Sequence, residues 1–168
     1  KVVVSIIPDA STQNLMYQNG ELDIIDLESL DSSIVQSTYK TTYADKLVTA
    51  PRVGLTYLAM NENNEFLSNV KVRQAVQKAI DVDAIIKSVY SGDAVAEAGV
   101  IPTGVWGHNS GLQRVGYDVE GAKALIKEAG YSDGQIKFEL AMDTAASGST
   151  QLVYQIIQQQ LAAVGLQA

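Results

Sequence analysis

The chain has 168 residues and a formal net charge of −7, with 46% hydrophobic and 18% charged residues. This composition is typical of a globular protein and excludes a disordered one. The thinly spread lysines and arginines argue against nucleic acid as a partner, because phosphates are bound by clustered cations. No apolar run approaches the ~20 residues of a membrane-spanning helix. The absence of cysteine excludes thiol catalysis, disulfides and thiolate metal sites.

The first 50 residues contain short periodic segments separated by turn residues. Their patterns predict strands over 2–7, 22–25 and 47–50, and two short helices, of which the second covers 31–39. Ser11 or Thr12 can cap the first helix, which Gly20 stops. Asp31 or Ser32 can cap the second.

Four carboxylates follow the first predicted helix, at Glu21, Asp23, Asp26 and Glu28. Such a cluster can bind a divalent cation, or it can form an edge turn whose acids face water. The spacing lacks the Asp-x-Asp-x-Asp-Gly order of a calcium loop, which favours the solvated turn. A small α/β hydrolase that uses these acids is a rival function.

Residues 51–55 connect two predicted strands, 47–50 and 56–60. Gly54 permits a close approach of the backbone to a ligand, and Arg52 can pair with a carboxylate. A β-turn with a solvated arginine explains the same residues equally well.

Two capped helices are predicted between residues 68 and 92. The apolar residues of the first follow the spacing of one buried face, at Val72, Ala75, Val76, Ala79 and Ile80. Ser68 or Asn69 can cap this helix, and Asp81 can cap the second, which Gly92 stops. The second helix is expected to bury Ala84, Ile85 and Val89.

Glycines and prolines interrupt residues 92–117 throughout, which predicts a long irregular loop. This loop holds Trp106 and His108, the only tryptophan and the only histidine. Trp106 can line a ligand cleft or plug the loop onto the core, and we favour plugging. His108 is not expected to act as a catalytic base, because nothing nearby completes a Ser/His/Asp set.

The last third of the chain predicts helix, strand and helix. Asp118 can cap the first helix, 136–141 alternates as a strand, and the final helix is capped by Ser149 or Thr150 and stopped by Gly165. Together the elements predict an α/β fold with a mixed β-sheet flanked by helices. The sequence has no phosphate-binding loop, metal-ligand spacing or nucleophile motif, so we expect no cofactor, no metal and no catalytic residue.

Two ordered strings resemble the signature of the extracellular solute-binding proteins of family 5, the oligopeptide, dipeptide and nickel receptors of ABC importers. The first matches at Asn61, Phe66, Val72, Arg73, Gln74, Ala75, Ile80, Asp81, Ile85, Ile86 and Gly92. The second matches at Tyr117, Asp118, Ala122, Lys123, Leu125, Glu128, Ala129, Gly130 and Tyr131. Gly20, Glu21 and Asp23, and later Ile101, Pro102, Trp106 and Asn109, also fit the family pattern in the correct order.

The resemblance implies a truncated, type II-like lobe of a periplasmic binding protein. Residues 1–50 would end the first lobe, and 51–168 would form most of the second lobe, cut before its last strands. It implies a non-enzymatic receptor that is extracellular or periplasmic, either membrane-anchored or free in the full-length protein. Its partners would be a peptide or other small ligand, captured by closure of two lobes, and an ABC permease in the membrane.

The residues expected to line the ligand cleft are Arg52, Val53, Gly54, Leu55 and Trp106, whereas Arg73 is expected to be structural. The chain opens directly on a strand pattern and ends as a new apolar stretch begins. We therefore expect an internal piece that holds part of the cleft and binds ligand weakly by itself. A non-catalytic module that docks on a permease through the loop containing His108 is a further alternative.

Overall fold

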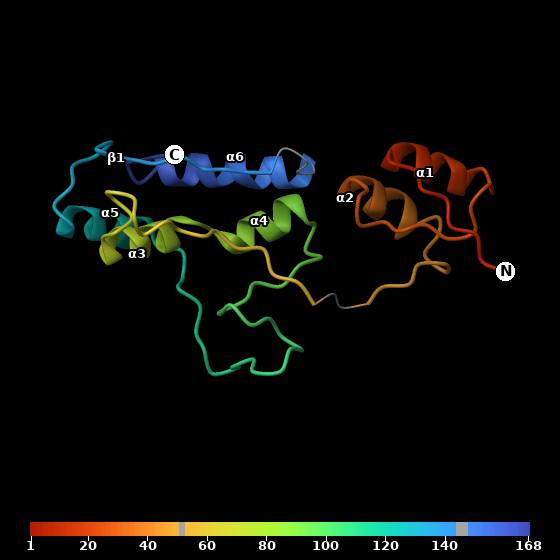
Figure 1. Cartoon of the computed structure of the whole chain (residues 1–168), viewed down its shortest axis with the longest axis horizontal. Helices are drawn as coiled ribbons and strands as arrows, with labels where there is room; N and C mark the ends of the chain where they lie inside the picture. Colours follow the sequence, from red (N-terminus) through yellow and green to blue (C-terminus); the bar gives the residue numbers. More distant parts are fainter. Residues whose placement is uncertain (51–52, 144–147) are drawn as a thin grey trace. The chain divides into compact units, whose positions relative to one another are not determined.

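The computed structural model describes residues 1–50, 53–143 and 148–168. The chain forms two units, Lys1–Thr49 and Ala50–Ala168, and Figure 1 labels their α-helices and β1. Their boundary falls next to the predicted division after residue 50, while their assignment to two lobes stays a prediction. Among the described residues, every helix is too short or too polar to cross a lipid bilayer.

The first unit contains α1 (Ala10–Gln18), α2 (Ser32–Ile34) and the π-helix η1 (Val35–Tyr39). Asp9 caps α1, because its carboxylate accepts hydrogen bonds from the backbone N–H and the hydroxyl of Thr12 at 2.7 and 2.6 Å. The predicted cap by Ser11 or Thr12 is therefore wrong, since Thr12 is the donor. Asp31 caps α2 as predicted, and Gly20 follows α1 with a φ of 78°.

Three tyrosines form the centre of the first unit. The ring of Tyr39 lies 5.9 Å from that of Tyr17 and 5.5 Å from that of Tyr43. Tyr39 is 3% exposed, and its hydroxyl donates a 2.7 Å hydrogen bond to the Asn14 side chain on α1. This aromatic contact joins η1 to α1.

The strands predicted over 2–7, 22–25 and 47–50 do not form. The backbone there belongs to no β-ladder within the described residues, and Val2, Val4 and Ile6 are 83–93% exposed. A strand requires a neighbouring strand to take its backbone hydrogen bonds. A β-branched composition alone does not supply that neighbour.

The second unit contains α3 (Val70–Ala79), α4 (Val82–Val89), α5 (Val119–Glu128), β1 (Ile136–Lys137), α6 (Gly148–Ala162) and β2 (Leu166–Gln167). The predicted caps of the first three helices are confirmed, with Asn69, Asp81 and Asp118 each accepting a backbone N–H of the following turn. The helix α6 begins at Gly148, so Ser149 and Thr150, which were the predicted caps, lie inside its first turn.

Four residues of the predicted apolar face of α3 are buried, namely Val72, Ala75, Val76 and Ala79, whereas Ile80 follows the helix and is half-buried. The helix α3 packs against α5 and α6. Ala84 was expected in the core but is exposed, whereas Ile85 and Val89 of α4 are buried as predicted. The same core includes the fully buried side chains of Val72, Ile136, Leu161 and Leu166.

The sheet among the described residues is a parallel pair, in which Ile136 of β1 lies opposite Leu166 of β2. The predicted strand over 136–141 is thus two residues long, although Phe138 and Leu140 still pack on the core as the alternation predicts. The predicted strand over 56–60 is absent. Helices that pack around a small sheet confirm the α/β class.

Polar contacts hold α3 against α5. The Lys78 ammonium lies 2.8 Å from the Asp118 carboxylate, and the Asp118 N–H donates to the Lys78 carbonyl at 2.8 Å. The Lys78 contact, followed by the Gly121 N–H, lowers the pKa of the Asp118 carboxyl from its usual value. A second ion pair, between Lys71 and Glu128 at 3.0 Å, joins the opposite ends of the same two helices.

Candidate ligand-binding site

The segment 53–60, which enters the second unit, presents residues on two sides. Leu58 and Met60 pack against the core, whereas Val53 and Tyr57 are 62% and 70% exposed. A Cβ added at Gly54 would meet no heavy atom within 4 Å, so a ligand can approach this backbone closely. Leu55 is half-buried, and the predicted Arg52 lies outside the described residues.

The loop over 93–117 contains its own hydrogen bonds and an ion pair to a helix. The Glu97 carboxylate accepts the Thr103 N–H at 2.9 Å, and the His108 ring donates from Nδ1 to the Ile101 carbonyl at 2.9 Å. The Thr103 contact, with a smaller contribution from His108, lowers the pKa of the Glu97 carboxyl. Figure 1 shows this loop, in green, extending away from the helices of its unit.

Trp106 is 98% exposed, so the prediction that it plugs the loop onto the core is wrong. Val95 and Val100 of the same loop are 78% and 82% exposed. Among the described residues, no hydrogen bond, ion pair or ring contact joins Trp106 to Val53, Gly54 or Leu55. Val53, Gly54 and Trp106 are therefore accessible to a ligand, whereas Leu55 is half-buried.

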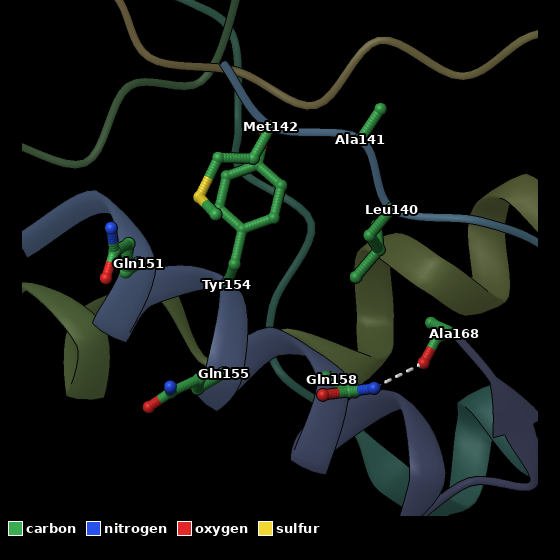
Figure 2. A pocket seen from close by; sticks show the side chains of 8 residues that line it. All are labelled: Leu140, Ala141, Met142, Gln151, Tyr154, Gln155, Gln158 and Ala168. Atoms are coloured by element: carbon green, nitrogen blue, oxygen red, sulfur yellow. Dashed lines mark hydrogen bonds between the residues drawn. The ribbon is translucent and has the colours of Figure 1, made fainter. Parts of the chain in front are cut away.

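An open cavity of about 580 Å³ lies between the chain that follows β1 and the first turns of α6 (Figure 2). Its lining consists of Leu140, Ala141, Met142, Gln151, Tyr154, Gln155, Gln158 and Ala168. Sequence reasoning missed this cavity, although the spacing of Gln151, Tyr154, Gln155 and Gln158 places them on one face of a helix. The lining offers amide and hydroxyl groups beside apolar side chains, so it can form hydrogen bonds with neutral polar groups.

The carboxylates after α1 form a turn. Asp26 accepts the Glu28 N–H at 2.9 Å, and Glu21 lies 3.4 Å from the Asn19 amide nitrogen. Within the part of the chain that the structure describes, no three acidic or histidine side chains are arranged to hold a metal ion. These contacts support the solvated turn over the cation site.

The whole chain, residues 1–168, matches the family model of the bacterial extracellular solute-binding proteins, family 5, middle part. The chain belongs to this family. It is 38% identical over 133 residues to a dipeptide-binding protein of Escherichia coli, covering 79% of this chain and 24% of that protein. It is 35% identical over 134 residues to a heme-binding protein of Haemophilus influenzae, covering 80% and 24%. A glutathione-binding protein of Salmonella choleraesuis is 32% identical over 163 residues, covering 96% and 30%.

Solved structures confirm the fold of periplasmic binding proteins. A periplasmic binding protein of Helicobacter pylori, solved with the peptide STSA, superimposes with a TM-score of 0.75 at 30% identity, covering 96% of this chain and 30% of that one. The NikA protein of Brucella suis, solved with Fe(III)-EDTA, gives 0.79 at 23% identity over 98% and 35%, which supports the fold alone. The chain thus spans about a quarter to a third of the length of these relatives.

Proposed function

We propose that the chain is part of the substrate-binding receptor of an ABC importer, and that the receptor captures a peptide or other small ligand by closure of two lobes. The observation that carries the proposal is the family match over residues 1–168. A dipeptide-binding relative and a neighbour solved with a peptide support the ligand class. The receptor performs no chemistry and acts outside the cytoplasmic membrane, with an ABC permease as its partner.

In this proposal the unit Lys1–Thr49 ends the first lobe, and the unit Ala50–Ala168 forms most of the second. The cleft is lined by Arg52, Val53, Gly54 and Leu55 where the chain passes between lobes, and by Trp106 from the loop over 93–117. Exposure supports the choice, because the Val53 and Trp106 side chains are 62% and 98% exposed and therefore available to a ligand. Arg52 is proposed from sequence alone, as the group that pairs with a ligand carboxylate.

The test uses the natural full-length protein and pools of peptides, nickel salts and oligosaccharides. A ligand present at 100 times its dissociation constant stabilises the protein by about 2.7 kcal/mol, which raises the thermal midpoint measurably. We expect a shift with one pool, of which peptides are the first choice. The absence of a shift with any pool would overturn the proposed function.

Variants then test the cleft residues by titration calorimetry with the active pool. Trp106→Ala should weaken binding at least about tenfold, because a large aromatic side chain at the centre of an interface contributes strongly. Val100→Ala is the matched control, since Val100 is an exposed apolar residue of the same loop outside the proposed cleft. Equal affinity of the Trp106→Ala variant and wild type would remove Trp106 from the cleft and leave the receptor proposal standing.

A second candidate function is favoured by the exposed apolar residues of the same loop, which suit a docking surface for the permease. Deletion of residues 104–111 separates the two possibilities. If the loop binds ligand, the deletion weakens ligand binding. If the loop docks on the permease, ligand binding is retained and permease binding is lost.

A further inference from the structure

A side-chain ion pair joins the loop over 93–117 to its unit. Arg114, near the end of the loop, donates from Nη2 to the Asp83 carboxylate at 2.7 Å. Asp83 lies in the first turn of α4, so the bond connects the returning arm of the loop to the helix that precedes it. The Arg114 contact lowers the pKa of Asp83, as expected for a carboxylate stabilised in its charged form.

The part of the loop around Trp106 is a tight double turn. The Val105 N–H donates to the Pro102 carbonyl at 3.2 Å, and the His108 N–H donates to the Val105 carbonyl at 3.0 Å. Gly104 and Gly107 flank Trp106 with φ values of 89° and 92°, a conformation that glycine adopts without strain. The double turn therefore fixes the backbone at Trp106 locally.

The loop presents three apolar side chains to solvent. Val95, Val100 and Trp106 are all more than three-quarters exposed, and their burial against the core would be favourable. The turns fix the local shape of the loop. A bond from its returning arm to a helix can in addition fix where the loop lies, and the Arg114–Asp83 pair is such a bond.

We propose that Arg114 is a positioning residue, whose ion pair with Asp83 clasps the loop over 93–117 to α4 and holds Trp106 ready to receive the ligand. This inference rests on the proposed function for the role of Trp106, but the clasp itself can be tested without ligand. A loop ordered before binding leaves less conformational entropy to be lost when the ligand arrives. The ligand affinity of the receptor then depends on a residue that does not touch the ligand.

The first measurement is made on the ligand-free chain, in which Trp106 is the only tryptophan. Arg114→Gln should increase the amplitude of nanosecond motion in the time-resolved fluorescence anisotropy of Trp106, and should speed exchange of loop amides by about two- to fivefold, as for an exposed ion pair. In about 1 M salt, where charges are screened beyond roughly 3 Å, the anisotropy and amide exchange rates of the wild type should approach those of the variant. The same two quantities in the variant should change little with salt.

Two further variants separate a clasp from a general loss of structure. The exchanged pair Asp83→Arg with Arg114→Asp should restore the wild-type anisotropy and exchange rates. Glu120→Gln removes a surface ion pair with Lys123 on α5 and should leave the loop unchanged. Loop motion in Arg114→Gln equal to wild type, or a failure of the exchanged pair to restore it, would overturn the clasp.

Ligand binding by the full-length protein distinguishes this inference from the proposed function. If both hold, Arg114→Gln weakens binding about two- to fivefold, in step with the loosened loop. A loosened loop with unchanged affinity would overturn the positioning role of Arg114 in binding, while the shift of thermal midpoint with ligand would still support the receptor. A complete absence of ligand binding in wild type would instead overturn the proposed function.

Discussion

Replacement of Leu161 by alanine tests the core of the second unit most directly. Leu161 is fully buried on α6, which packs against α4, α3 and β2. The change removes three carbon atoms, and at about 0.8 kcal/mol for each buried methylene the lost transfer free energy is about 2.4 kcal/mol. The cavity left behind raises the expected loss of unfolding free energy to about 3–4 kcal/mol.

Urea unfolding followed by circular dichroism measures this loss. With an m-value of about 2 kcal/mol/M, the midpoint should fall by roughly 1.5–2 M. Leu152→Ala is the matched control, because Leu152 lies on the same helix but is 44% exposed, and it should cost no more than about 1 kcal/mol. Equal losses for the two variants would show that the α6 face assigned to the core is wrong.

Three further predictions address single contacts. Asp118→Asn should destabilise the second unit near neutral pH. Lys78 lowers the pKa of Asp118 in the folded state, so the ionised carboxylate contributes its full stabilisation above the unfolded pKa of 3.8 and loses it as pH falls through the folded pKa. A difference between the urea midpoints of variant and wild type that is the same at neutral and acidic pH would contradict this. Gly165→Ala should lower the unfolding free energy more than Gly130→Ala. Both glycines have φ above 80°, where alanine loses about 1–2 kcal/mol, but only a Cβ at position 165 meets a carboxylate oxygen. Equal thermal midpoints of the two variants would refute the effect of that contact. Tyr39→Phe removes a hydrogen bond worth about 0.5–1.5 kcal/mol and should speed amide exchange in η1, whereas unchanged rates would show that the hydroxyl contributes nothing.

The features that the sequence predicts correctly are decided within a few residues. A cap needs one side-chain oxygen and an N–H two or three residues later, and Asn69, Asp81 and Asp118 all satisfy that condition. The glycines that stop helices adopt positive φ at Gly20, Gly92, Gly130 and Gly165. The buried face of α3 follows from spacing along a single helix. The cap of α1 is Asp9, which lies two or three residues before the predicted Ser11 or Thr12. Aspartate, serine and threonine side chains can all cap a helix, so the residue type alone does not decide between them.

The strand predictions failed because a strand is decided by residues far away. The run over 2–7 has the composition of a strand but no partner in the described part of the chain. The run over 136–141 keeps its alternating burial, yet within the described residues only Ile136 and Lys137 pair, with Leu166 and Gln167 of β2. Composition indicates which segments can pair, and the partner decides which of them do.

The candidate site was predictable only in part for the same reason. The glycines and prolines locate the loop over 93–117, and the family resemblance points to Trp106 within it. Neither indicates whether that ring is buried or exposed, because the position of the loop depends on contacts between residues far apart in the sequence. The proposed clasp joins Arg114 to Asp83, which are 31 residues apart. Nothing in either residue's neighbourhood marks it as half of a pair. The charge exchange at positions 83 and 114 therefore tests a feature that only the folded chain reveals. A restored loop would show that a non-local ion pair decides where the locally ordered turn around Trp106 is held.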